Sequence, residues 1–117
     1  MRKEQPLARI AEVTDGTFES DVLKSSIPVL VLFWSPIDES RERVEAAMED
    51  IANRFQDRVR IAILNAQEYQ HVRTALRITQ FPTLALFKGD RVVEICPCTL
   101  AGPQVERLIE QSLVLAA

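Results

Sequence analysis

The distribution of hydrophobic and polar positions divides this chain into short strand-like and helix-like segments. Val29 to Phe33 is a continuous apolar run, too short for a helix, and such a run is typical of a strand that is covered on both faces. The pattern changes after Ser35-Pro36, and from Val44 apolar residues recur at helical spacing. The sequence therefore predicts a central strand that leads through a tight turn into a helix from about Glu39 to Phe55.

The segments on either side complete an alternating order of strands and helices, βαβαβαββα. Thr14 to Thr17 supplies turn and capping residues before a short helix, and Lys88-Gly89-Asp90 is typical of a hairpin turn between two antiparallel strands. The other predicted strands are Leu7 to Val13, Val59 to Leu64, Leu84 to Phe87 and Arg91 to Cys96, of which we expect Val59 to Leu64 to run parallel to the central strand. The other predicted helices are a short one with Phe18, Val22 and Leu23 on its inner face, Gln67 to Leu76, and about Gly102 to Leu113.

Composition narrows the class of protein. With 117 residues, 47% of them hydrophobic and 26% charged, the chain fits a single globular domain over residues 1–117. A net charge of −3 without a basic stripe argues against nucleic acid as a partner. The N-terminal segment lacks the apolar region of a signal peptide, and no apolar run has the length of a membrane span. We expect a cytoplasmic protein with neither membrane contact nor cofactor.

The corner between the central strand and its helix is the first candidate site, because ligands in α/β sheets usually bind where a strand ends and a helix begins. Asp38 lies there, followed by Arg41. These two residues suit a charged ligand or partner group, but their spacing also suits a local ion pair in which Asp38 caps the helix, and we favour the cap. Asp38 and Glu39 are not expected to act as paired catalytic carboxylates, because adjacent residues at a helix start diverge.

Three phrases of the sequence resemble the thioredoxin family over about Val13 to Leu113. They are Val13-Thr14-Asp15 with Phe18 and Val22-Leu23-Lys24, then Pro28-Val29-Leu30-Val31 with Phe33-Trp34, then Phe81-Pro82-Thr83 with Leu86-Phe87-Lys88. The resemblance implies the α/β thioredoxin fold. In that fold a βαβ unit and a ββα unit form one central mixed sheet, with helices on both faces.

The resemblance fails at the family's active-site motif, Trp-Cys-Gly-Pro-Cys. Counted from Phe33-Trp34, an acid at Asp38 and a base at Arg41 replace the two cysteines, and the family's buried acid falls at Leu32. Dithiol exchange needs a thiolate that attacks a disulfide and a second thiol that resolves the mixed disulfide, and a carboxylate does neither. We therefore expect the usual activity to be absent. The five motif positions are Ile37, Asp38, Glu39, Ser40 and Arg41.

Pro82 resembles the family's cis-proline, which faces the active-site corner. Cis peptide bonds are nearly confined to bonds before proline, and Phe81-Pro82 is the best candidate in this chain. In the family the backbone before this proline pairs with an extended substrate segment, so the resemblance implies that Phe81 offers an edge for strand addition. Trp34 is expected to pack beneath the corner. The binding groove implied by these positions consists of Trp34, Ile37, Asp38, Arg41, Phe81, Pro82 and Cys98.

Cys96 and Cys98 are the only thiols in the sequence. A spacing of two in a strand puts both side chains on one face with Cα atoms roughly 6.5–7 Å apart, so a disulfide between them would be strained and easily reduced. By the family resemblance Cys98 falls where thioredoxins have a glycine on the substrate-facing rim. We favour a packing role for Cys96 and a surface role for Cys98 over a redox role. Metal binding ranks last, because two cysteines and the distant His71, expected to be a solvated helix residue, do not make a four-ligand zinc set.

Two functions follow from these positions. The first is a non-catalytic or chaperone-assisting module that holds an extended segment of another protein, in partial resemblance to the thioredoxin domain of the chaperone-linked redoxins. The second is an atypical thiol-disulfide oxidoreductase or redox sensor that attacks through Cys98 and resolves through Cys96. We rank it second because the negative charge of Asp38 nearby would raise the pKa of Cys98. The sequence leaves the partner and the oligomeric state open.

Overall fold

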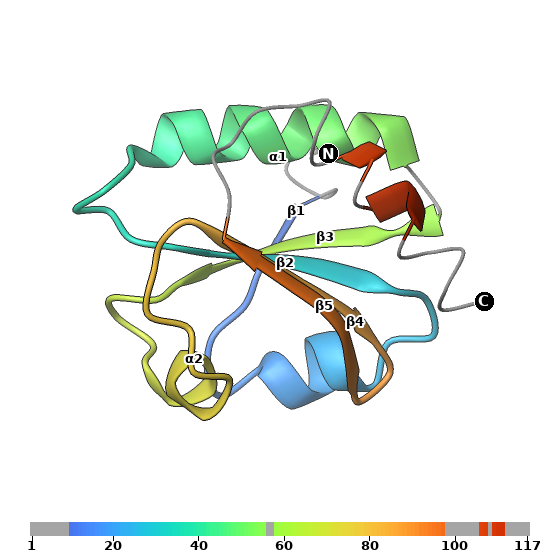
Figure 1. Ribbon diagram of the computed structural model, residues 1–117, viewed down its shortest axis with the longest axis horizontal. Coiled ribbons are helices and arrows are strands. Elements are labelled where there is room, and N and C mark those ends of the chain that lie inside the picture. The colour runs from blue at the N-terminus through green and yellow to red at the C-terminus, as the bar shows by residue number, and fades with distance from the viewer. Residues whose placement is uncertain (1–9, 56–57, 98–105, 108, 112–117) are drawn as a thin grey trace, which may run out of the picture.

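A single five-stranded sheet lies between two layers of helix (Figure 1). The computed structural model describes residues 10–55, 58–97, 106–107 and 109–111. The strands are β1 (Ile10–Glu12), β2 (Val29–Trp34), β3 (Arg60–Asn65), β4 (Thr83–Lys88) and β5 (Arg91–Pro97), and the helices are the π-helical η2 (Glu19–Leu23), α1 (Arg41–Phe55) and α2 (His71–Ala75).

The sheet is mixed, with strand order β1-β3-β2-β4-β5. β1, β3 and β2 are parallel, while β4 is antiparallel to β2, and β5 is antiparallel to β4. α1 is therefore the crossover between the parallel strands β2 and β3, as the pattern predicted. At the centre of the sheet, Leu30 of β2 pairs with Ile61 on one side and Leu86 on the other.

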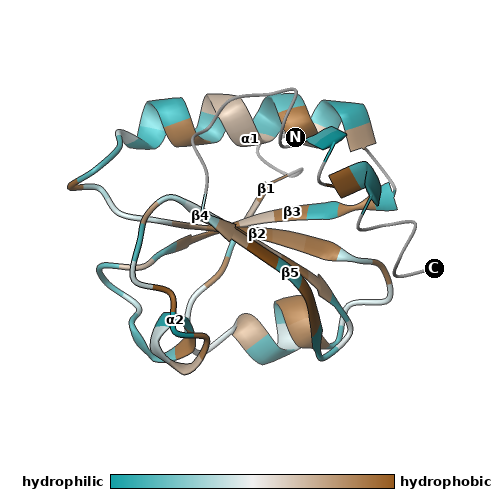
Figure 2. Cartoon of the chain, viewed as in Figure 1, coloured by the Kyte–Doolittle hydropathy of each residue, from teal (hydrophilic) through white to brown (hydrophobic). Residues whose placement is uncertain are grey.

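β2 is buried along its whole length because both of its faces are covered. Leu30, Leu32 and Trp34 pack into the core layer on the α1 side, which also receives Ile109. The intervening residues, Val29, Val31 and Phe33, pack into the second layer, on the side of η2 and α2. In Figure 2 the hydrophobic colour follows the strands, and α1 alternates between hydrophobic and hydrophilic colour along its length, as a helix with one buried face does. The continuous apolar run of β2 thus follows from its central place.

The largest differences from the predicted bounds are in a helix and a strand. The predicted helix Gln67 to Leu76 is shortened to α2, His71–Ala75. Its first part is a turn instead, because the Asn65 side-chain oxygen accepts the backbone N–H groups of Gln67 and Glu68, at 3.1 and 3.2 Å. β1 covers only Ile10–Glu12 of the predicted strand Leu7 to Val13, whose first residues lie outside the described residues.

The end of the chain agrees with the predicted final helix where it is described. Residues 106–107 and 109–111 are helical, and Ile109 is fully buried, while the predicted start at Gly102 lies outside the described residues. Among the helices in the described ranges, none is both long and apolar enough to cross a membrane.

Candidate functional site

The candidate residues gather at one end of the sheet, where β2 ends, β4 begins and β5 ends (Figure 1). The register connects the three strands, because Phe33 of β2 pairs with Thr83 of β4, and Thr83 pairs with Pro97 of β5. Pro82 immediately precedes Thr83 in the chain. The corner after β2, Pro82 and Cys96 therefore lie at the same end of the sheet.

The corner itself is a tight turn built on Ser35. The buried Ser35 accepts the N–H of Ile37 on its Oγ at 3.2 Å, and its carbonyl accepts the N–H groups of Asp38 and Glu39 at 3.0 Å each. This turn leaves the Ile37 side chain 76% exposed and the Asp38 side chain exposed as well. An aliphatic side chain and a carboxylate are thus presented to solvent at the site.

The predicted cap at Asp38 is wrong, because α1 begins at Arg41 and not near Glu39. Ser40 is the residue before the helix, and its Oγ accepts the N–H of Arg43 at 3.2 Å, as an N-cap does. Asp38 lies two residues farther from the helix, outside capping reach. The predicted ion pair between Asp38 and Arg41 is also wrong, because the Arg41 guanidinium pairs with other carboxylates.

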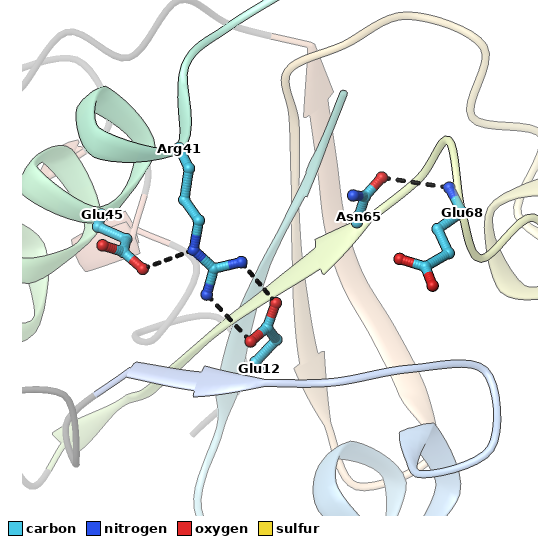
Figure 3. A network of polar contacts seen from close by, with 5 residues as sticks. All are labelled: Glu12, Arg41, Glu45, Asn65 and Glu68. Atoms are coloured by element: carbon cyan, nitrogen blue, oxygen red, sulfur yellow. Dashed lines mark hydrogen bonds and ion pairs between the residues drawn. The ribbon is translucent and has the colours of Figure 1, made fainter. Parts of the chain in front are cut away.

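Arg41 connects β1 to α1 through two carboxylates (Figure 3). Its Nη1 and Nη2 donate to the two oxygens of Glu12 at 2.7 and 3.0 Å, and its Nε donates to Glu45 at 2.8 Å. The hydrogen bond from Arg41 lowers the pKa of Glu12, and the hydrogen bonds to Glu12 and Glu45 raise the pKa of Arg41. The guanidinium is therefore committed to carboxylates of its own chain.

Trp34 packs inside the core and does not line an open surface. Its side chain is 2% exposed, and its Nε1 has no hydrogen-bond partner among the described residues. The neighbouring Leu32, at the position of the family's buried acid, is 0% exposed in the same core layer. Trp34 is therefore not part of the predicted binding groove, and it packs in the core beneath the corner.

Phe81 and Pro82 form the opposite side of the site. The peptide bond between them is cis, and both residues are half-buried. Phe81 takes part in no backbone hydrogen bond between residues that the structure describes. Thr83, which follows, is buried and donates its hydroxyl to the Gln80 carbonyl at 2.6 Å, closing the turn before β4. The turn thus fixes the position of the Phe81 backbone, whose N–H and C=O groups have no backbone partner among the described residues.

Arg73 is a site residue that the sequence did not indicate. From α2 its guanidinium lies over the Phe81 ring, with 5.5 Å between the guanidinium carbon and the ring centroid. Its Nε donates to the Ala66 carbonyl at 2.9 Å, and its Nη1 donates to the Ile78 carbonyl at 3.5 Å. No local spacing signals this contact, because it depends on how the chain folds back between β3 and β4.

The two cysteines differ in what the structure describes. Cys96 is half-buried in β5, pairs with Leu84 in the register, and its thiol donates to the Pro97 carbonyl at 3.5 Å. Cys98 lies outside the described residues, so the surface role expected for it and its redox alternative both stay predictions. Within the described ranges, no three histidine, cysteine or acidic residues are grouped as a metal site requires. His71 is an exposed residue of α2.

The comparison with known families decides the identity of the fold. The family model for thioredoxin matches residues 9–111. This chain belongs to the thioredoxin family. It is 33% identical over 105 residues to thioredoxin 1 of Nostoc sp., across 86% of this chain and 98% of that protein. It is 42% identical over 83 residues to thioredoxin 1 of Synechococcus elongatus (70% and 78%) and 35% identical over 104 residues to the thioredoxin of Acidithiobacillus ferridurans (89% and 96%).

These matches confirm the family resemblance and the α/β thioredoxin fold that the sequence predicted. They also bear on the two predicted functions. Because the relatives are named thioredoxins, they favour a thiol-disulfide function over the non-catalytic binding module that we ranked first. By the family resemblance, the corner nevertheless carries Asp38 and Arg41 in place of the motif's cysteines.

Proposed function

We propose that this thioredoxin-family protein exchanges thiols and disulfides through Cys98 and Cys96 in place of the family's corner cysteines. The observation that carries this function is the register of β4 and β5, in which Pro97 pairs with Thr83, the residue after cis-Pro82. The half-buried thiol of Cys96 therefore belongs to the end of the sheet that the family uses. The names of the relatives support the same class of chemistry.

The exchange takes two steps and needs no cofactor. The Cys98 thiolate attacks one sulfur of a partner disulfide, the partner's S–S bond breaks, and its other sulfur leaves as a thiolate. The Cys96 thiolate then attacks the Cys98 sulfur of the mixed disulfide and releases the second partner thiolate. The partner gains two electrons, the protein loses two as a Cys96–Cys98 disulfide, and the protons of the two protein thiols end on the partner. A dithiol reductant restores the protein for another turn.

The reduction of insulin disulfides in the presence of dithiothreitol tests this function. The wild type is compared with Cys96→Ser, Cys98→Ser and a thioredoxin that has the usual motif. We expect wild-type activity above the dithiothreitol background and loss of that activity in Cys98→Ser. When pre-reduced Cys96→Ser, which lacks the resolving thiol, is mixed with insulin without dithiothreitol, a mixed disulfide should accumulate. Equal background rates in the wild type and both variants would overturn the redox function.

A non-catalytic binding function is the second candidate, and one observation favours it. Ile37 is exposed at the end of the sheet where the unused backbone of Phe81 lies. We call Ile37, Phe81 and Pro82 the Pro82 edge. An extended protein segment that pairs with the Phe81 backbone would gain hydrogen bonds along its chain and an apolar contact from Ile37. Binding of an unfolded peptide by a Cys96→Ser/Cys98→Ser double variant, with the affinity of the wild type, would favour this second function.

A further inference from the structure

We infer that Arg73 makes the Pro82 edge selective for an extended segment with an acidic side chain beside Phe81. This selectivity rests on the proposed function, because both candidate functions bring an extended partner segment to Phe81. It adds the chemical class of the partner, which neither the family nor the corner motif specifies.

Three contacts hold the Arg73 side chain in one place. The carbonyls of Ala66 and Ile78 accept its Nε–H and Nη1–H, and the Phe81 ring lies beneath its guanidinium. Arginine side chains normally lose considerable rotamer freedom when they bind a ligand. Because Arg73 is already ordered, most of that entropic cost falls on folding and not on binding, which favours a partner that fits the fixed guanidinium.

The positive charge of Arg73 has no carboxylate partner among the described residues. Arg41, Arg43, Arg54 and Arg58 each pair with an aspartate or glutamate at 3.6 Å or less. The two groups that bind Arg73 are neutral carbonyls, and the residue stays half-exposed. Arginine presents its donors as a planar fork that matches a carboxylate, so the remaining N–H groups suit an acidic side chain.

Strand addition would bring such a side chain to Arg73. Side chains of an extended segment alternate between its two faces, so a segment paired with the Phe81 backbone directs one in two toward the Phe81 ring. A glutamate at that position would lie beside the guanidinium that covers the ring. A lysine there would meet a like charge, which is unfavourable at short distance.

Three matched dodecapeptides of alanine, serine and valine test this selectivity. They differ at one central residue, which is Glu, Gln or Lys, and fluorescence anisotropy measures their binding to the full chain at low salt. We expect the Glu peptide to bind about fivefold more tightly than the Lys peptide, as for a partly exposed ion pair. The difference should shrink in 0.5 M salt, should nearly vanish in Arg73→Gln, and should reverse in Arg73→Glu.

Two further variants test whether the preference depends on a positive charge at the Pro82 edge. Arg91→Gln removes the same charge at the far end of the sheet and should keep the preference, and Arg73→Lys keeps the charge and should keep part of it. Circular dichroism verifies that each variant is folded. A preference that survives in folded Arg73→Gln, or wild-type binding without any preference, would overturn the selectivity alone. If none of the peptides binds the wild type, the selectivity and the proposed binding edge both fail.

Discussion

The guanidinium of Arg41, which by the family resemblance takes the place of the motif's second cysteine, binds the carboxylates of Glu12 and Glu45. Glu12 lies 29 residues earlier in the chain, at the end of β1. Spacing along the sequence suggested Asp38 as the partner because it considers only neighbours on one helical turn. The substitution of a thiol by a base therefore has a structural role here, since it connects the first strand to the helix that begins at the corner.

Replacing Arg41 should make stability less dependent on pH. Arg41 lowers the pKa of Glu12 in the folded chain, so the pair stabilises the fold above the unfolded pKa of about 4.3, and this contribution is lost as the pH falls through the folded pKa. We expect Arg41→Gln to lower the free energy of unfolding by about 0.5–1 kcal/mol at pH 7, because the pair is half-exposed. The deficit should disappear near pH 2, as urea denaturation at both pH values can measure.

Arg43→Gln is the matched control for Arg41→Gln. Arg43 makes a single contact of 3.3 Å with Glu39, and its side chain is largely exposed. Its loss should change the free energy of unfolding by less than about 0.5 kcal/mol. If Arg41→Gln is as destabilising at pH 2 as at pH 7, the network does not act through the ionisation of Glu12.

At the scale of elements, periodicity predicted which strands and helices exist, and contacts between segments decided where they end. β2 was predictable because a strand covered on both faces is apolar throughout. The start of α2 was not predictable, because its first turn depends on Asp15, 56 residues away along the chain. The two carboxylate oxygens of Asp15 accept the N–H groups of His71 and Val72 at 3.1 and 3.0 Å. An acidic residue from another segment thus caps this helix, a role that no local pattern reveals.

Removing that cap should loosen α2. We expect Asp15→Ala to lower the free energy of unfolding by about 1 kcal/mol, the usual effect of a lost N-cap, and to speed amide exchange at His71 and Val72 before other amides. Denaturation and hydrogen exchange followed by NMR give the two measurements.

Asp38→Ala provides the comparison for the same change of residue. Asp38 is exposed and makes no side-chain hydrogen bond or ion pair within the described residues, so its loss should change stability by less than about 0.5 kcal/mol. A larger loss of stability in Asp38→Ala than in Asp15→Ala would show that the corner, and not α2, depends on an aspartate.

Over the whole molecule, the fold and the active-site chemistry are separable. Alternate residues of β2 face the two core layers, and this arrangement depends on apolar side chains and not on the residues at the corner. The fold was therefore predictable from patterns spread over the chain. The site was predictable only in part, because the family resemblance implied the place of Pro82, whereas the contact of Arg73 with Phe81 depends on tertiary packing.

Leu32 is an example of this separation, and its replacement should change the stability of the whole fold. By the family resemblance it falls at the position of the family's buried acid, and its apolar side chain is fully buried in the layer beneath α1. Leu32→Ala should lower the free energy of unfolding by about 2–5 kcal/mol through lost burial and the cavity that remains. The denaturant midpoint should fall while the dependence on denaturant stays unchanged.

Ile37→Ala is the control, because this side chain is 76% exposed and should contribute less than about 0.5 kcal/mol to stability. The same variant should weaken peptide binding at the Pro82 edge. Similar losses of stability in Leu32→Ala and Ile37→Ala would contradict the assignment of Leu32 to the core.

The hairpin turn between β4 and β5 offers a place to attach a reporter group. Gly89 at its tip has a φ of +61°, and a Cβ added there would meet no atom within 4 Å. β4 extends from Lys88 to Thr83, about 17 Å, so the tip and Pro82 lie at opposite ends of the sheet. A labelled segment inserted at this tip would immobilise the protein on a sensor surface and leave the Pro82 edge facing the solution.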